Sequence, residues 1–241
     1  IRGSIVIEGF KLAALEAGRR LLAIYEDDFQ SETKGDGSPV TIADQEAEEI
    51  ILKHLSGLCA DVPVIAEEAM AAGIMPEIGL RFILVDPLDG TREFINRNGE
   101  FTVNIALIED GVPVKGVIYA PVTGELFWGE VGQGAYRAVV NDLELGDVIE
   151  INCSVFSDEL RVLASRSHRS ERTEALLAKL ENSYTVAAGS SLKFCRLAEG
   201  KADFYPRLEP TMEWDTAAGQ AILCAAGGAV VVEGGAPLIY G

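Results

Sequence analysis

The run FTVNIALIEDGVPVKGVIYAPVTGELFWGEVGQGAY, residues 101–136, constrains the fold more than any other stretch of the chain. Its apolar segments have strand length and are separated by Asp-Gly, Thr-Gly and Gly-Gln-Gly, which are typical of tight turns. Apolar segments joined in this way predict consecutive antiparallel hairpins. We therefore expect an antiparallel sheet in the middle of the chain.

The segments before these hairpins predict two helices and two strands. Apolar residues recur at helical spacing over 5–25 and 44–58, with a polar, glycine-bearing loop between them. The runs VPVIA and RFILVD are short, apolar and lead directly into acids, as buried strands do when they deliver carboxylates at their carboxyl ends. We expect residues 1–157 to form an α+β lobe.

After about residue 157 the pattern changes to an alternation of strand-like and helix-like segments. Strands are expected at 160–165, 184–189, 202–208 and 229–235, and helices at 170–181, 191–200 and 216–227. This alternation predicts an α/β lobe over 158–241. A chain of 241 residues suits two closely packed lobes better than two free modules.

The charge of the chain limits its partners. It has 20 Lys and Arg against 38 Asp and Glu, a net charge of -18, which argues against a general affinity for nucleic acid or anionic lipid. An anionic ligand must be met by a local arrangement of cations. Residues 161–207 provide one, with nine Lys and Arg against five acids.

Cysteine use and hydropathy point to a cytoplasmic protein. The four cysteines are far apart and form no C-x-x-C pair, which predicts reduced, mostly buried thiols. No apolar run has the length of a membrane-spanning helix, and no signal-peptide pattern is present. Peripheral association with the inner membrane and a homodimer both stay open.

Carboxylates at four separate places are the first candidate functional residues. Most of them follow an apolar run, where a lone acid would be costly to bury, although each one alone could equally be a strand end or a helix cap. Ligation by oxygen alone, with only two histidines in the chain, suits Mg²⁺ or Mn²⁺. The residues are Asp44, Glu67, Glu68, Asp86, Asp89 and Asp215.

The motif DPLDGT, residues 86–91, concentrates this chemistry. Pro87 restricts the backbone, so Asp86, the Leu88 carbonyl and Asp89 could all face one point. Two divalent ions roughly 4 Å apart at such a point can hold both the attacking and the leaving oxygen of a phosphoryl transfer. The motif therefore favours metal-dependent phosphoryl chemistry.

The second half of the motif predicts a phosphate and water site. Gly90 and Thr91 would present backbone N–H groups at a helix start, which binds anions readily. The Thr91 hydroxyl could orient an attacking water if a base lies within hydrogen-bond reach. Asp44 and Glu68 are the candidate bases.

Three basic motifs in the second lobe, ASRSHRS, GSSLK and YPRLEP, lie at strand-to-helix junctions, where small residues and donors often bind anions. Composition alone treats His168, in the first of them, as an ordinary surface residue. Other cations, such as Lys179, fit solvated helix faces.

Several of these motifs, in this order, resemble the inositol monophosphatase-like superfamily of metal-dependent phosphatases: PVTIAD, AEE, DPLDGTREFINRNGEFTVNIALIEDGVPVKGVIYAP and WDTAAG. The segment REFINRNGEFTVNIALI is more similar to the 3'(2'),5'-bisphosphate nucleotidase branch than to inositol monophosphatase, where the segment usually reads closer to TNFVHGFP. The resemblance implies a layered α/β/α/β/α sandwich of the inositol monophosphatase and fructose-1,6-bisphosphatase type, with two or three Mg²⁺ ions between the lobes.

The resemblance also implies roles for individual residues. Asp44 and Glu68 would be outer acids or ligands of a weaker additional ion, with Asp44 paired to Thr91 to activate water. The implied metal ligands are Glu67, Asp86, the Leu88 carbonyl, Asp89 and Asp215, and the implied nucleotide-binding residues are His168, Ser190, Lys193 and Arg207. Two departures stand out: Ala69 replaces a third acid, and the stretch 207–215 is short.

The resemblance thus implies an Mg²⁺-dependent phosphatase that releases the 3'-phosphate of adenosine 3',5'-bisphosphate in sulfur assimilation, with sensitivity to lithium. One alternative is an inositol-phosphate or sugar-phosphate phosphatase with the same metal core. Another is a non-catalytic nucleotide or metal sensor, which the full set of expected metal ligands argues against.

Overall fold

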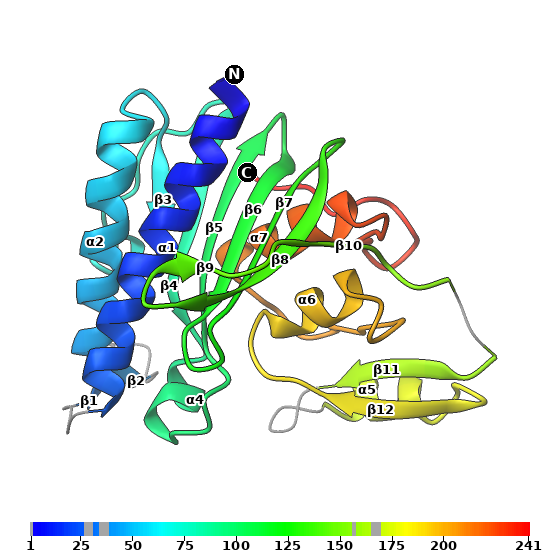
Figure 1. Cartoon of the computed structure of the whole chain (residues 1–241). Helices are drawn as coiled ribbons and strands as arrows, with labels where there is room; N and C mark the ends of the chain where they lie inside the picture. Colours follow the sequence, from blue (N-terminus) through cyan, green and yellow to red (C-terminus); the bar gives the residue numbers. More distant parts are fainter. Residues whose placement is uncertain (1, 27–30, 34–38, 156–157, 165–169) are drawn as a thin grey trace.

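The computed structural model describes residues 2–26, 31–33, 39–155, 158–164 and 170–241. Figure 1 shows five layers, in the order α/β/α/β/α. The outer helices are α1 (Arg2–Glu26) and α2 (Ile42–Leu58), and the inner helices are α6 (Leu192–Ala198) and α7 (Glu213–Ala225). A large sheet separates these pairs, and a small sheet separates the inner helices from α5 (Glu171–Leu177). The predicted layered α/β sandwich is confirmed.

The large sheet has eight strands, in the order β10-β8-β7-β6-β5-β4-β3, with β9 paired to β8. Its strands are β3 (Val64–Ala66), β4 (Arg81–Asp89), β5 (Thr102–Glu109), β6 (Val112–Ala120), β7 (Glu125–Glu130), β8 (Gly134–Asn141), β9 (Glu144–Leu145) and β10 (Ile149–Ile151). Strand β3 runs parallel to β4, and the remaining neighbours are antiparallel. The hairpins predicted over 101–136 are therefore confirmed as β5 to β8. Two short strands, β1 (Ser31–Thr33) and β2 (Pro39–Thr41), pair separately.

Both faces of the large sheet are covered by apolar helix faces. Phe10 of α1 and Ile51 of α2 are fully buried against one face. Helix α7 lies on the other face, where Ile222 is fully buried. Glycine permits this close approach, because a Cβ atom at Gly116 of β6 would lie 2.4 Å from the Ala218 carbonyl oxygen. The amino end of α7, which carries Asp215, is thereby fixed beside the sheet.

In the second part of the chain, β11 (Leu160–Ala164) runs parallel to β12 (Ser183–Ala187). The strands predicted at 202–208 and 229–235 are wrong. Pro206 removes a ladder donor from the first, which is reduced to an isolated bridge between Phe204 and Val162. A reversal at Gly234 and Gly235, both with positive φ, cuts the second to another isolated bridge. The lobe boundary at 157/158 stays a prediction.

The structure also describes the cysteine thiols and the apolar character of the helices. All four cysteines are free thiols, and Cys59 and Cys195 are buried. Burial raises the pKa of the Cys195 thiol well above its usual value, which keeps it protonated. In the described part of the chain, no helix combines the length and the apolar character needed to cross a membrane.

Candidate active site

The site is built around the carboxyl end of β4. Asp86 pairs with Asn104 and Asp89 with Thr102 of β5, and the register shifts between these two pairs. The DPLD segment is therefore a bulge within a strand, and bulges re-aim side chains near active sites. The backbone N–H of Leu88 donates to Asp86 Oδ1 at 3.0 Å, so the bulge holds this carboxylate directly.

A short helix, α4 (Thr91–Ile95), follows at once, as the motif predicted. Gly90 precedes it with a φ of 92°, a conformation that favours glycine. The Thr91 hydroxyl donates to the Leu88 carbonyl oxygen at 3.3 Å. Gly90, Thr91 and Leu88 thus form one compact corner beside Asp89, and the implied pairing of Thr91 with Asp44 stays a prediction.

Acids from four elements gather around Asp86, which is 1% exposed. Burial raises the pKa of Asp86 well above its usual value, and the charges of Glu67, Asp89, Asp215 and Asp44 raise it further. Asp44 is fully buried in the first turn of α2. Acids that are far apart in the sequence, from Asp44 to Asp215, therefore lie close to Asp86 in one negatively charged region.

Helix α3 (Glu67–Ala71) supplies the two adjacent acids of this region. It begins directly after β3, so its first two residues, Glu67 and Glu68, leave the sheet beside the end of β4. Both side chains are half-buried. The predicted acid pair is therefore at a strand-to-helix junction, as its position after VPVIA indicated.

Hydrogen bonds within the protein hold several of these carboxylates. Asp89 Oδ2 accepts from the hydroxyls of Ser190 (2.6 Å) and Ser191 (2.7 Å). Asp215 Oδ2 accepts from the hydroxyl of Thr211. Within the described ranges, no three His, Cys, Asp or Glu side chains are close enough together to coordinate one metal ion as they stand. Asp89 and Asp215 are therefore each oriented by hydroxyl groups of neighbouring residues.

The chemistry of this region fits a hard divalent cation. Its donors are carboxylate oxygens and the Leu88 carbonyl, the ligands that Mg²⁺ prefers. A buried carboxyl whose pKa is raised by surrounding acids lacks a compensating positive charge, and a bound cation supplies one. The residues that could hold it are Glu67, Asp86, Leu88, Asp89 and Asp215.

A buried polar network that sequence reasoning missed connects this region to α6. The Thr102 hydroxyl lies 2.7 Å from Ser190 Oγ, and Asn104 Nδ2 donates to Ser191 Oγ at 2.9 Å. Both serines in turn contact Asp89. One signal was available in the sequence. Thr102 and Asn104 are two polar residues on the same face of a mostly apolar strand, where an unsatisfied polar group is costly.

A cavity of about 210 Å³ opens beside Asp89. It brings together residues from the two parts of the chain that the sequence singled out separately. Its lining includes Asp89, Gly90, Ser190, Lys193, Arg207 and Asp215. His168 lies outside the described residues.

Two cations and a tyrosine form one wall of the cavity. Lys193 Nζ is 5.4 Å from the centre of the Tyr205 ring, and Arg207 Nη1 donates to the Tyr205 hydroxyl at 3.3 Å. Lys193 is 5% exposed, and burial lowers the pKa of its ammonium group. A buried cation is stabilised by an anion, so this wall favours an anionic ligand. Tyr205 was not among the predicted residues.

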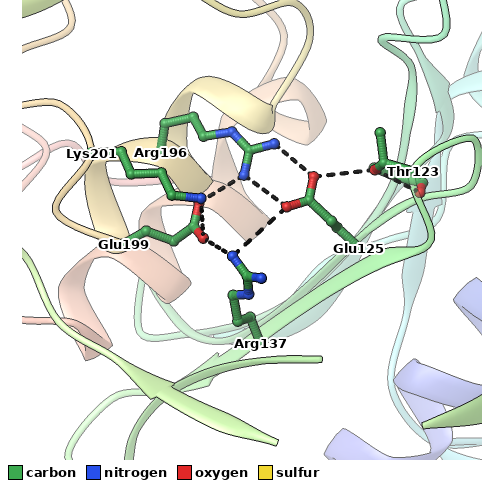
Figure 2. A network of polar contacts seen from close by, with 7 residues as sticks. Thr123, Glu125, Arg137, Arg196, Glu199 and Lys201 are labelled. Atoms are coloured by element: carbon green, nitrogen blue, oxygen red, sulfur yellow. Dashed lines mark hydrogen bonds and ion pairs between the residues drawn. The ribbon is translucent and has the colours of Figure 1, made fainter. Parts of the chain in front are cut away.

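A network of charged residues holds α6 to the large sheet (Figure 2). Arg196 donates to both oxygens of Glu125, at 3.0 and 2.6 Å, and to Glu199 at 2.7 Å. Arg137 of β8 also contacts Glu199, at 2.5 Å. Burial alone would raise the pKa of Glu199, but hydrogen bonds from Lys201 and the two arginines lower it below its usual value. The network fixes the helix that carries Lys193.

Comparison with known proteins identifies the family of this chain. A family model described as the inositol monophosphatase family matches residues 4–241. The chain belongs to the inositol monophosphatase family. The corner at Gly90, the converging acids and the adjacent basic wall are therefore features of a family member.

Several relatives with high sequence identity to this chain are nucleotidases. The chain is 46% identical over 216 residues to the 3'(2'),5'-bisphosphate nucleotidase CysQ of Salmonella typhimurium, covering 89% of this chain and 85% of that protein. It is 43% identical over 229 residues to CysQ of Escherichia coli, covering 94% and 90%. Among solved structures, CysQ from Bacteroides thetaiotaomicron matches with a TM-score of 0.78 and 43% identity, covering 94% and 88%.

Proposed function

We propose that this family member is an Mg²⁺-dependent phosphatase that removes the 3'-phosphate of adenosine 3',5'-bisphosphate, giving AMP and phosphate. The observation that carries the proposal is the position of Asp89, which belongs both to the converging acids and to the cavity wall with Lys193 and Arg207. A substrate with two phosphates fits such a site, because one phosphate can face the metal-binding acids and the other the cations. The nucleotidase relatives support the same substrate.

Glu67, Asp86, the Leu88 carbonyl, Asp89 and Asp215 would hold the metal. When bound, Mg²⁺ supplies charge that stabilises the phosphoryl oxygens in the transition state. The same proposal includes two or three bound ions, and Mn²⁺ as a replacement for Mg²⁺.

The remaining site residues act on water and substrate. Asp44, through the Thr91 hydroxyl, accepts the proton of a water whose oxygen bonds to phosphorus as the bond to the 3'-oxygen breaks. The 3'-oxygen takes up a proton from solvent water and leaves as a hydroxyl, and Asp44 then returns its proton to solvent. The amides of Gly90 and Thr91 donate to the phosphoryl oxygens, and Glu68 is an outer acid.

The second phosphate and the nucleoside would contact the basic wall. Lys193 and Arg207 bind the 5'-phosphate, and Ser190 holds Asp89 in place through its hydroxyl. His168 is included among the nucleotide-binding residues on sequence resemblance alone. The division into a metal-binding lobe (1–157) and a nucleotide-binding lobe (158–241) belongs to the same proposal.

A role in sulfur assimilation fits this reaction, since it would clear the bisphosphate by-product. We further propose a cytoplasmic location, which the four free thiols support. Inhibition by lithium, a homodimer and peripheral contact with the inner membrane belong to the same proposal.

The deciding experiment measures phosphate release from a panel of substrates with and without Mg²⁺. The panel contains adenosine 3',5'-bisphosphate, 3'-phosphoadenosine 5'-phosphosulfate, inositol 1-phosphate and fructose 1,6-bisphosphate. We expect Mg²⁺-dependent release with the highest kcat/KM for the adenosine compounds. A preference for inositol 1-phosphate would replace the proposal with the inositol-phosphate alternative, and no release from any compound would favour a non-catalytic sensor.

A further inference from the structure

Glu48 of α2 is a buried acid that none of the roles above uses. It is 4% exposed. Its Oε2 atom accepts from the backbone N–H of Glu68 at 2.7 Å, and its Oε1 atom accepts from the backbone N–H of Ala69 at 2.8 Å. Both oxygens of one carboxylate are therefore bound to consecutive amides of another helix, α3.

These two bonds replace a cap that α3 lacks. The residue before the helix, Ala66, has no side-chain oxygen, and no side chain caps the helix from that position. The first amides of a helix have no partner within the helix and need an acceptor from elsewhere. Bonds from amides to a carboxylate are short and strong, which offsets the cost of burying the charge.

The location of Glu48 connects it to the acids of the active site. Asp44 lies one helical turn earlier on α2, so both side chains are on the same buried face. Glu67 and Glu68 form the first turn of α3, the turn whose amides Glu48 binds. One face of α2 therefore supplies Asp44 and also fixes the backbone that carries Glu67.

We infer that Glu48 is a positioning residue for the metal site, which holds the first turn of α3 at a fixed place relative to Asp44. The inference rests on the proposed function, because it requires that Glu67 ligate a metal ion. Glu48 acts through the α3 backbone and contacts neither metal nor substrate. Residues that orient metal ligands in this way usually contribute about 10- to 100-fold to metal affinity or activity.

The test measures Mg²⁺ binding by isothermal titration calorimetry without substrate, so that turnover does not enter. In Glu48→Gln, the amide group keeps one acceptor and turns an N–H₂ towards the second backbone amide. Glu48→Asp keeps the charge and shortens the reach by one methylene. We expect both variants to bind Mg²⁺ about tenfold more weakly than wild type.

Two control variants on the same helix separate the effects of charge and stability. Glu49→Gln removes an exposed charge one residue away, and Ile51→Val weakens the core of α2 while keeping the Glu48 carboxylate. Neither is expected to change Mg²⁺ affinity by more than about twofold.

Three outcomes would overturn the inference while leaving the metal site intact: wild-type Mg²⁺ affinity in Glu48→Gln, weakening in Glu48→Gln but not in Glu48→Asp, or equal weakening in Ile51→Val. The second would indicate a long-range charge effect without positioning. A wild-type protein that binds no Mg²⁺ would refute the proposed metal site and this inference together. If Glu48→Gln does not fold, the Glu48→Asp and Ile51→Val comparison decides the question.

Discussion

Replacing Lys193 by Met tests whether the basic wall binds the second phosphate of the substrate. Lys193 is almost fully buried, and Met fills a similar volume without the charge. Two of the three ammonium N–H groups face carbonyl oxygens, of Ser190 at 2.7 Å and of Ala188 at 3.5 Å. One N–H group is left for a phosphate oxygen.

The expected loss follows from that single bond. A hydrogen bond to a charged group contributes about 1.5–3 kcal/mol, which corresponds to roughly a 10- to 150-fold change in an equilibrium constant. KM for adenosine 3',5'-bisphosphate should therefore rise by about 10- to 150-fold. The value of kcat should change much less, because the proposed function places the phosphate being cleaved at the acids and not at Lys193.

Adenosine 3'-monophosphate provides the decisive comparison. It lacks the second phosphate, so its kcat/KM should be nearly unchanged in Lys193→Met at saturating Mg²⁺. Replacement of the exposed Lys179 by Met is the control for a change in net charge. An equal loss of kcat/KM for both substrates would refute the assignment, because it would mean that Lys193 acts through Ser190 and Asp89 instead of through the second phosphate.

Three further predictions concern other parts of the molecule. Asp89→Asn should lower phosphate release by at least about a hundredfold, since it removes a charge from the proposed metal ligands; near wild-type turnover would contradict the metal site. Gly116→Ala should lower Tm by roughly 2–12 °C, because its Cβ would meet the Ala218 carbonyl oxygen at 2.4 Å and cost about 1–3 kcal/mol; an unchanged melting curve would show that α7 can move away. The pKa of Glu199 is lowered in the folded protein, so its stabilising effect is present above its unfolded value of about 4.5 and is lost as pH falls through the folded value. In urea unfolding between pH 6 and about pH 3, the stability difference between wild type and Glu199→Gln should therefore shrink with falling pH, and a constant difference would rule this out.

Local patterns were sufficient to predict several of the acids that lie near Asp86. The acids at 67 and 86 follow apolar runs, and those runs form the parallel neighbours β3 and β4, whose carboxyl ends lie side by side. Asp89 lies three residues after Asp86 in a segment where Pro87 limits the backbone. Periodicity and turn chemistry are local properties, so a single sequence reveals them.

The supporting contacts could not be predicted in the same way. Asn104 donates to Ser191 across 87 sequence positions, and Ser191 donates to Asp89 across 102. Glu48 reaches the amide of Glu68, 20 positions away, from a different helix. In each case a polar residue is visible in the sequence, but its partner is decided by how the elements pack.

The strands predicted at 202–208 and 229–235 were wrong for a related reason. The segments ADFYPRL and AVVVEGG have the apolar content of strands, but neither extends a ladder beyond an isolated bridge. Pro206 lacks the N–H that a ladder requires, and Gly234 and Gly235 reverse the chain. Apolar content predicts burial more reliably than it predicts strand pairing.

The charges of the site also explain how a chain with a net charge of -18 can bind a substrate that is itself strongly anionic. Under the proposed function, Lys193 and Arg207 would attract one end of such a substrate, but the adjacent acids would repel the other end unless cations were bound among them. Binding of Mg²⁺ and binding of the bisphosphate must therefore favour each other, since each supplies charge that the other needs. The reciprocal effect should be measurable: the bisphosphate should tighten Mg²⁺ binding by the same factor by which Mg²⁺ tightens bisphosphate binding, and a neutral nucleoside should have no such effect.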